Sequence, residues 1–172
     1  MTTLKIILIA LIIAISGWGC SASQIPEGLQ IRVERVVSGQ TIEYLDPTTP
    51  TPTMQQVRLI GIASPDLNQH PWGRAAQNRL TQLVQGREVI LELGAESRDR
   101  FDRVLAYVWL DDILLNKQLV EEGYVLAEEY LPNTKYSQTL EHAQLEARTL
   151  KRGIWNPQQP LRLTPREFRR QR

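Results

Sequence analysis

An alternating stretch that ends in a tight turn constrains this chain more than any other feature. In residues 29–37, apolar residues such as Ile31 and Val33 alternate with charged residues, and "VVSGQT" follows at residues 36–41. Alternation with a period of two indicates a β-strand with one buried face, and Ser-Gly-Gln after β-branched residues is typical of a turn. We therefore expect a β-hairpin whose second strand covers residues 41–44.

Further short strands and then helices follow this hairpin. Three prolines in residues 46–53 exclude a strand interior there, so this stretch is expected to be a loop. The apolar patterns predict strands at residues 56–62, 87–93 and 104–109, and helices at residues 75–84, 114–122 and 136–151. The last helix is expected to place one row of side chains on a single face: Tyr136, Leu140, Ala143, Ala147 and Leu150. These elements predict a small α+β domain, and the pattern leaves open whether its strands close into a barrel.

The first 20 residues have the layout of a signal peptide or membrane anchor. Lys5 is their only charged residue, residues 6–15 are all apolar, and small residues precede Cys20, the only cysteine of the chain. The position of Cys20 resembles that of the lipidated residue of a bacterial lipoprotein, so we predict lipidation there and a tether over residues 21–28. We therefore expect a bacterial protein that is secreted or held in the cell envelope by a lipid anchor.

Charge is spread unevenly along the chain. The net charge of the whole sequence is +1, but residues 162–172 contain five arginines and one glutamate, and Lys5 adds one more positive charge. Residues 21–161 therefore carry a net charge of −4, which is unusual for a body that binds many phosphates. For the basic tail, residues 156–172, two interpretations stay open: a flexible solvated end, or an arm that contacts nucleic acid or anionic lipid.

Five collinear motifs resemble those of staphylococcal-nuclease-like (thermonuclease) domains. They are "VVSGQT", "RLIGIASPD" at residues 58–66, "RDRFDRVLAYVW" at 98–109, "LLNKQLVEEGYV" at 114–125 and "GIW" at 153–155. The resemblance spans about residues 29–155. It implies a five-stranded OB-type β-barrel with about three helices, and nucleic acid as the substrate.

The resemblance also implies where a catalytic site would lie. Members of this family that cleave nucleic acid hold Ca²⁺ with an Asp in the hairpin turn, an Asp at a strand end and the next backbone carbonyl. A Glu positions the attacking water, and two arginines bind the scissile phosphate. In this chain the arginines correspond to Arg58 and Arg103, and the Glu to Asp66. Tyr130 corresponds to a tyrosine that lines the nucleotide pocket, and Glu128 to a second one.

The metal ligands of the family are replaced in this chain. The turn acid corresponds to Gln40, the strand-end acid to Ala63 and the carbonyl donor to Ser64. Calcium affinity depends on the number and charge of oxygen ligands, so we expect a weak or absent Ca²⁺ site. Glu43 and Asp46 are the nearest candidates to substitute for these acids, although the simpler interpretation for both is a solvated face or a surface ion pair.

Two interpretations remain for the arginines and two for the protein. Arg58 and Arg103 either face phosphate or pair with one of the nearby acids, which are Asp66, Asp99 and Asp102. Strand alternation predicts that Arg58 points away from the core, toward the open side of the barrel or water. The protein is either a degenerate homologue that keeps phosphate or single-stranded nucleic-acid binding with little cleavage, or an active secreted or anchored endonuclease with a modified metal site.

Overall fold

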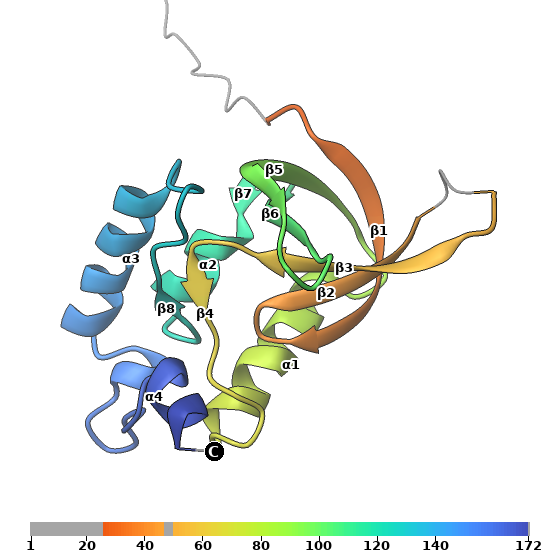
Figure 1. Ribbon diagram of the computed structural model, residues 1–172. Coiled ribbons are helices and arrows are strands. Elements are labelled where there is room, and N and C mark those ends of the chain that lie inside the picture. Colours follow the sequence, from red (N-terminus) through yellow and green to blue (C-terminus); the bar gives the residue numbers. More distant parts are fainter. Residues whose placement is uncertain (1–25, 47–49, 172) are drawn as a thin grey trace, which may run out of the picture.

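The structure is a computed structural model that describes residues 26–46 and 50–171 (Figure 1). The predictions for the signal or anchor at residues 1–20, for Cys20 and for most of the tether lie outside these residues. None of the helices in the described part of the chain is both long and apolar enough to cross a membrane.

A curved antiparallel sheet forms most of the domain. Its strands occur in the spatial order β3-β2-β1-β5-β6-β7. Their bounds are β1 Leu29–Ser38, β2 Thr41–Asp46, β3 Thr53–Leu59, β5 Glu88–Arg98, β6 Val104–Leu110 and β7 Ile113–Leu114. The predicted hairpin is confirmed, because β1 and β2 pair antiparallel with Ser38 opposite Thr41.

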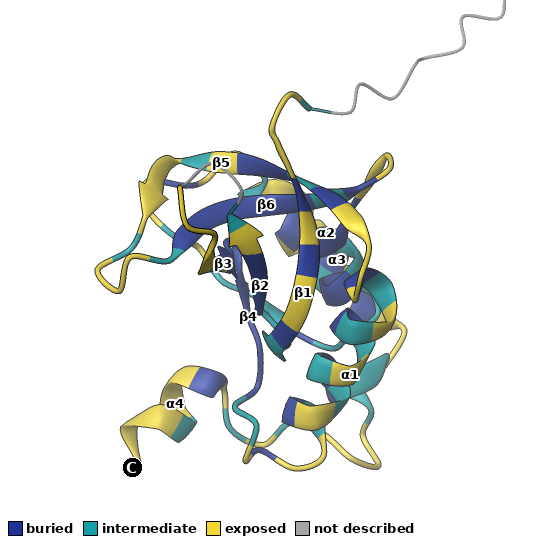
Figure 2. Cartoon of the chain, turned by 90° about the vertical axis from the view of Figure 1, so that its right-hand side faces the viewer, coloured by how far each residue is buried: buried dark blue, intermediate teal, exposed yellow. Residues whose placement is uncertain are grey.

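The sheet closes into a barrel through one parallel pairing. Strand β3 pairs with β2 on one side and with β6 on the other, with Arg58 opposite Leu105. The predicted five-stranded barrel is therefore confirmed, and the short strand β7 extends it. Alternation of buried and exposed residues is visible along β1 in Figure 2 and fills the interior with apolar side chains.

The strand predicted at residues 56–62 is divided in two. Strand β3 ends at Leu59, and β4 (Ile62–Ala63) leaves the barrel to pair with β8 (Leu126–Ala127). Gly61 lies between them with a φ of +77°, a conformation that favours glycine. A Cβ atom at Gly61 would also meet Leu140 Cδ1 at 2.5 Å, so the chain can turn here only without a side chain.

Three helices of seven or more residues pack beside the barrel, as predicted. They are α1 Trp72–Val84, α2 Leu115–Glu121 and α3 Ser137–Thr149. Helix α1 packs against β1, and α2 packs against both β6 and α3. Of the row predicted for α3, Leu140, Ala143 and Ala147 are buried, whereas Leu150 is exposed because α3 ends at Thr149.

The segment predicted to be a basic tail contains ordered structure. A 3-10 turn, η1 (Gly153–Trp155), is followed by residues 156–164 and by the short helix α4 (Pro165–Arg170). Helix α4 lies at the lower end of the molecule in Figures 1 and 2, near the start of α1. The C-terminal segment therefore returns to the body of the domain next to the end of β4.

Candidate functional site

The hairpin turn between β1 and β2 is packed tightly against its neighbours. A Cβ atom at Gly39 would approach Ser64 Oγ to 2.4 Å and Ala76 Cβ to 2.5 Å. Only glycine therefore lets the turn lie this close to α1 and to the segment after β4. This packing brings together two segments that are about 25 residues apart in sequence.

Gln40 links these two segments directly. Its side-chain oxygen Oε1 accepts a hydrogen bond from the backbone N–H of Ser64 at 2.6 Å. Its backbone oxygen accepts another from Leu59 N–H at 2.9 Å, at the end of β3. The amide side chain thus joins the turn to the end of β4, and it does so with a neutral group.

Asp66 follows two residues later in a compact turn. Its Oδ1 accepts hydrogen bonds from the backbone and side-chain nitrogens of Asn68, at 2.9 and 3.0 Å. Its backbone N–H donates to Gln69 Oε1 at 2.8 Å. Gln69 is itself buried, so the position of Asp66 is fixed from within the fold.

Arg103 enters the site from the turn between β5 and β6. Its Nε and Nη2 donate to Asp99 Oδ2 at 2.7 and 2.6 Å, and Asp99 Oδ1 accepts from the backbone N–H groups of Phe101 and Arg103. Burial alone would raise the pKa of Asp99, but these hydrogen bonds outweigh it and hold the pKa below its ordinary value. The structural ion pair that we considered for Arg103 is therefore present, with Asp99 as its partner.

Arg58 does not reach water. Its side chain is buried, and its guanidinium donates to the carbonyl oxygen of Ile62 at 2.6 Å and to that of Leu59. The guanidinium carbon lies 6.0 Å from the ring centroid of Tyr130. Burial lowers the pKa of Arg58 to about 10, with a further contribution from the nearby charge of Arg103, so Arg58 stays protonated at neutral pH.

One pocket of about 330 Å³ collects most of the predicted site residues. Gln40, Ser64, Asp66 and Arg103 all line it, whereas Arg58 and Tyr130 are not among its lining residues. Its lining also includes Ser38, which belongs to the hairpin-turn motif VVSGQT, and Arg169 of helix α4, which lies outside the five motifs. The pocket therefore joins the hairpin turn, the segment after β4, the start of β6 and the C-terminal helix.

Comparisons with known proteins agree with this geometry. Residues 56–157 match the family described as "Staphylococcal nuclease homologue". The chain belongs to this family. It is 35% identical to a thermonuclease of Staphylococcus hyicus over 130 residues, covering 73% of this chain and 75% of the relative. It is 38% identical to a thermonuclease of Staphylococcus intermedius (72% and 74%), and 33% identical to an uncharacterized endonuclease of Escherichia coli (76% and 79%).

The residues at the family's Ca²⁺ position do not suit a dication. Gln40 Oε1 already accepts a hydrogen bond, Ala63 presents a methyl group, and Asp66 is the only carboxylate among the described residues of the pocket lining. Two arginines line the same pocket, and their charge opposes a cation. Within residues 26–46 and 50–171, no group of three or more His, Cys, Asp or Glu side chains could hold a metal ion.

The acids considered as substitutes lie elsewhere. Glu43 is buried and accepts hydrogen bonds from Arg35 Nε at 2.7 Å and from Gln56 Nε2 at 2.9 Å. It therefore forms an ion pair on the barrel wall, where it does not line the pocket. Asp46 is also absent from the pocket lining.

Arg169 is the site residue that sequence reasoning missed. Its position in a basic C-terminal stretch favoured a solvated tail. A signal was nonetheless present in Thr164-Pro165-Arg166-Glu167, where a capping residue, a proline at the first helical position and a glutamate three residues after the cap predict a helix start.

Proposed function

We propose that this protein is a nucleic-acid-binding domain of the bacterial cell envelope, descended from a nuclease, with weak or no Ca²⁺-dependent phosphodiester cleavage. The observation that carries this proposal is the Gln40–Ser64 hydrogen bond. It joins, through a neutral amide, the two segments whose acids hold the metal in cleaving members of the family.

The chemistry that remains in the pocket suits binding of phosphate. Cleavage of a phosphodiester requires that the extra negative charge on phosphorus be neutralised, and a dication next to a positioned water does this efficiently. A guanidinium instead donates charge-assisted hydrogen bonds to phosphate oxygens in a planar, bidentate arrangement. Arg103 lines the pocket, so it is the residue that we assign to the phosphate of a single-stranded nucleic acid or a nucleotide.

We also propose that Cys20 carries a lipid that holds the protein on a membrane. The support is the apolar stretch at residues 6–15 followed by a single cysteine. A lipid anchor would place the domain in the envelope, where single-stranded nucleic acid or nucleotides taken up from outside are possible ligands.

Binding and cleavage should be measured together on the full-length chain. A fluorescein-labelled single-stranded DNA of ten thymidines is titrated in EDTA by anisotropy, and its cleavage is followed on gels as Ca²⁺ is raised from zero to saturating. We expect binding without Ca²⁺, weakening steeply with salt, and little cleavage at any Ca²⁺ concentration. Efficient Ca²⁺-dependent cleavage would instead establish an active endonuclease with a modified metal site.

Two variants separate a phosphate-binding role of Arg103 from a purely structural one. Arg103→Gln and Asp99→Asn both remove the Arg103–Asp99 ion pair, so they should affect stability in the same direction. Only Arg103→Gln removes the positive charge from the pocket. We expect oligonucleotide affinity to fall about tenfold in Arg103→Gln, the loss of one charge-assisted hydrogen bond, and to fall clearly less in Asp99→Asn, which keeps the positive charge but loosens its orientation. Equal losses in both variants would leave Arg103 with a structural role alone.

A further inference from the structure

A second guanidinium faces the candidate pocket from an element outside the barrel. Arg169 of helix α4 lines the pocket together with Arg103, although the two residues are 66 positions apart in the sequence. None of the ion pairs found among the described residues includes Arg169. The Arg169 side chain therefore adds a positive charge to the lining of the pocket.

Local interactions fix the start of α4. The Thr164 hydroxyl accepts a hydrogen bond from Glu167 N–H at 3.2 Å, and Glu167 Oε2 accepts one from Thr164 N–H at 2.7 Å. This reciprocal capping box stabilises a helix start, and Pro165 at the first helical position is buried against the domain. A six-residue helix is marginal alone, so its form here depends on these contacts.

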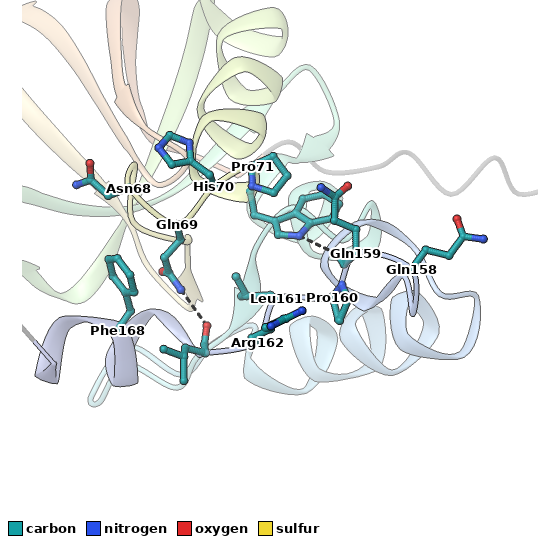
Figure 3. A pocket seen from close by; sticks show the side chains of 12 residues that line it. Asn68, Gln69, His70, Pro71, Gln158, Gln159, Pro160, Leu161, Arg162 and Phe168 are labelled. Atoms are coloured by element: carbon teal, nitrogen blue, oxygen red, sulfur yellow. Dashed lines mark hydrogen bonds between the residues drawn. The ribbon is translucent and has the colours of Figure 1, made fainter.

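Contacts from Gln69, in the loop before α1, and from Trp72, the first residue of α1, hold the segment that leads to α4. Gln69 Nε2 donates to the carbonyl oxygen of Leu163 at 2.9 Å, and Trp72 Nε1 donates to that of Gln159 at 3.0 Å; both bonds are drawn in Figure 3. Gln69 also accepts the backbone N–H of Asp66 through Oε1. One buried amide therefore couples the position of Asp66 in the pocket to the position of the C-terminal segment.

Arg103 and Arg169 line the pocket, and the charge of each acts on the buried guanidinium of Arg58. Burial is the main cause of the lowered pKa of Arg58, and Arg103 and Arg169 lower it further. Glu128 and Tyr130 act in the opposite direction. Of the two arginines that line the pocket, Arg103 is already paired with Asp99, so Arg169 adds the positive charge that a phosphate group would balance.

We propose that Arg169 is a phosphate-binding residue, and that helix α4 supplies to the pocket the positive charge that a metal ion supplies in cleaving members of the family. The ligand is a phosphate group of a single-stranded nucleic acid or a nucleotide, bound between Arg103 and Arg169 without a metal. This inference rests on the proposed function, and it adds a binding element that lies beyond residues 56–157, the part of the chain that matches the family.

The test compares two arginines of the same helix in the full-length chain. Arg169→Gln removes the pocket residue, and Arg166→Gln removes an equal charge from an exposed position that does not line the pocket. With labelled single-stranded DNA in EDTA, we expect Arg169→Gln to weaken binding about tenfold and to lower the salt slope by about 0.7, the value for one phosphate contact on a single strand. Arg166→Gln should weaken binding less than threefold, and both variants should keep the melting temperature of the natural protein.

The outcomes separate failure of this inference from failure of the proposed function. If the natural protein binds and Arg169→Gln does not change this binding, the role of Arg169 is overturned but the proposed function stands. The same holds if both variants weaken binding equally. No binding by the natural protein in EDTA overturns both. Arg169→Lys, which keeps the charge but loses the planar fork, should recover part of the lost affinity, whereas a helix that merely misfolds in Arg169→Gln would not be rescued in this way.

Discussion

The carboxylate of Asp99 determines how Arg103 is presented to the pocket. Asp99 accepts two hydrogen bonds from the guanidinium and two from the backbone of its own turn, and its side chain is only 5% exposed. Arg103 is 25% exposed, so part of the guanidinium is still free to meet a ligand. A single buried acid thus orients the cation and fixes the turn that carries it.

The lowered pKa of Asp99 predicts a dependence of stability on pH. Because the pKa is lower in the folded state, the charged form stabilises the fold above the ordinary value of 3.8, and this contribution is lost as the pH falls through the lowered pKa. Asp99→Asn should therefore lower the free energy of unfolding at pH 7, and its difference from the natural protein should shrink between about pH 5 and pH 2. Urea unfolding across this range measures it.

Asp102→Asn provides the matched control for this measurement. Asp102 pairs with Arg98 at 3.1 Å, but its side chain is 82% exposed, so solvent screens the pair. Its φ of 61° is also tolerated by asparagine. We expect only a small effect of Asp102→Asn on the free energy of unfolding at pH 7, and an equal loss in both variants would contradict a special role of Asp99.

Two substitutions, one in the pocket lining and one at the end of β4 beside it, should recreate a metal site. Gln40→Asp with Ala63→Asp restores both acids, and because Ala63 is only 4% exposed, the new carboxylates should lower the melting temperature when no metal is present. Added Ca²⁺ should raise it again, and isothermal titration should detect binding in the double variant but no tight site in the natural protein. A micromolar Ca²⁺ site in the natural protein would show that Gln40 and Ala63 do not prevent binding.

At the scale of elements, the local pattern predicted most strands well and their connections poorly, and closure into a barrel followed only from the family resemblance. Alternation places β1 and the start of β5, whereas β6 is a continuous apolar run that is buried almost throughout. The order of the motifs brings Gln40, Ser64, Asp66 and Arg103 to one pocket. The two-residue strands β4 and β8 exist only through their mutual pairing, which leaves no periodic signal. The burial of Arg58 depends on the turn after β3, whose carbonyl groups accept its hydrogen bonds. Helix α4 was hidden by its basic composition.

Removal of the cap of α4 should loosen this helix without unfolding the domain. Thr164→Ala deletes one half of the capping box and should cost the helix about 1 kcal/mol. Hydrogen exchange should become faster in a peptide that covers residues 164–171, while the melting temperature stays near that of the natural protein because Pro165 is the only buried residue of α4. Thr149→Ala, which removes an exposed hydroxyl at the end of α3, should leave exchange in this peptide unchanged.

At the scale of the molecule, the structure shows where the unevenly distributed charge of the sequence lies. The body carries a net charge of −4, and the positive charge is concentrated in a segment that folds back to the candidate pocket. Strand β1 has ten residues and ends at the hairpin turn of this pocket, so the strand starts roughly 30 Å away from it. Figure 1 shows the start of β1 at the end of the molecule opposite to α4. An anchor ahead of β1 would therefore leave the pocket on the side that faces away from the membrane.

The proposed anchor predicts where the protein is found and whether its pocket works there. The natural protein should incorporate labelled fatty acid at Cys20 and sediment with membranes, because each buried CH₂ of an acyl chain contributes about 0.8 kcal/mol. Cys20→Ser should abolish the label and keep oligonucleotide affinity, since the pocket lies at the far end of β1. The natural protein on lipid vesicles should bind the same oligonucleotide as tightly as Cys20→Ser does in solution. Absence of label at Cys20 would contradict the proposed lipid anchor. Loss of binding on vesicles would indicate that the pocket faces the membrane.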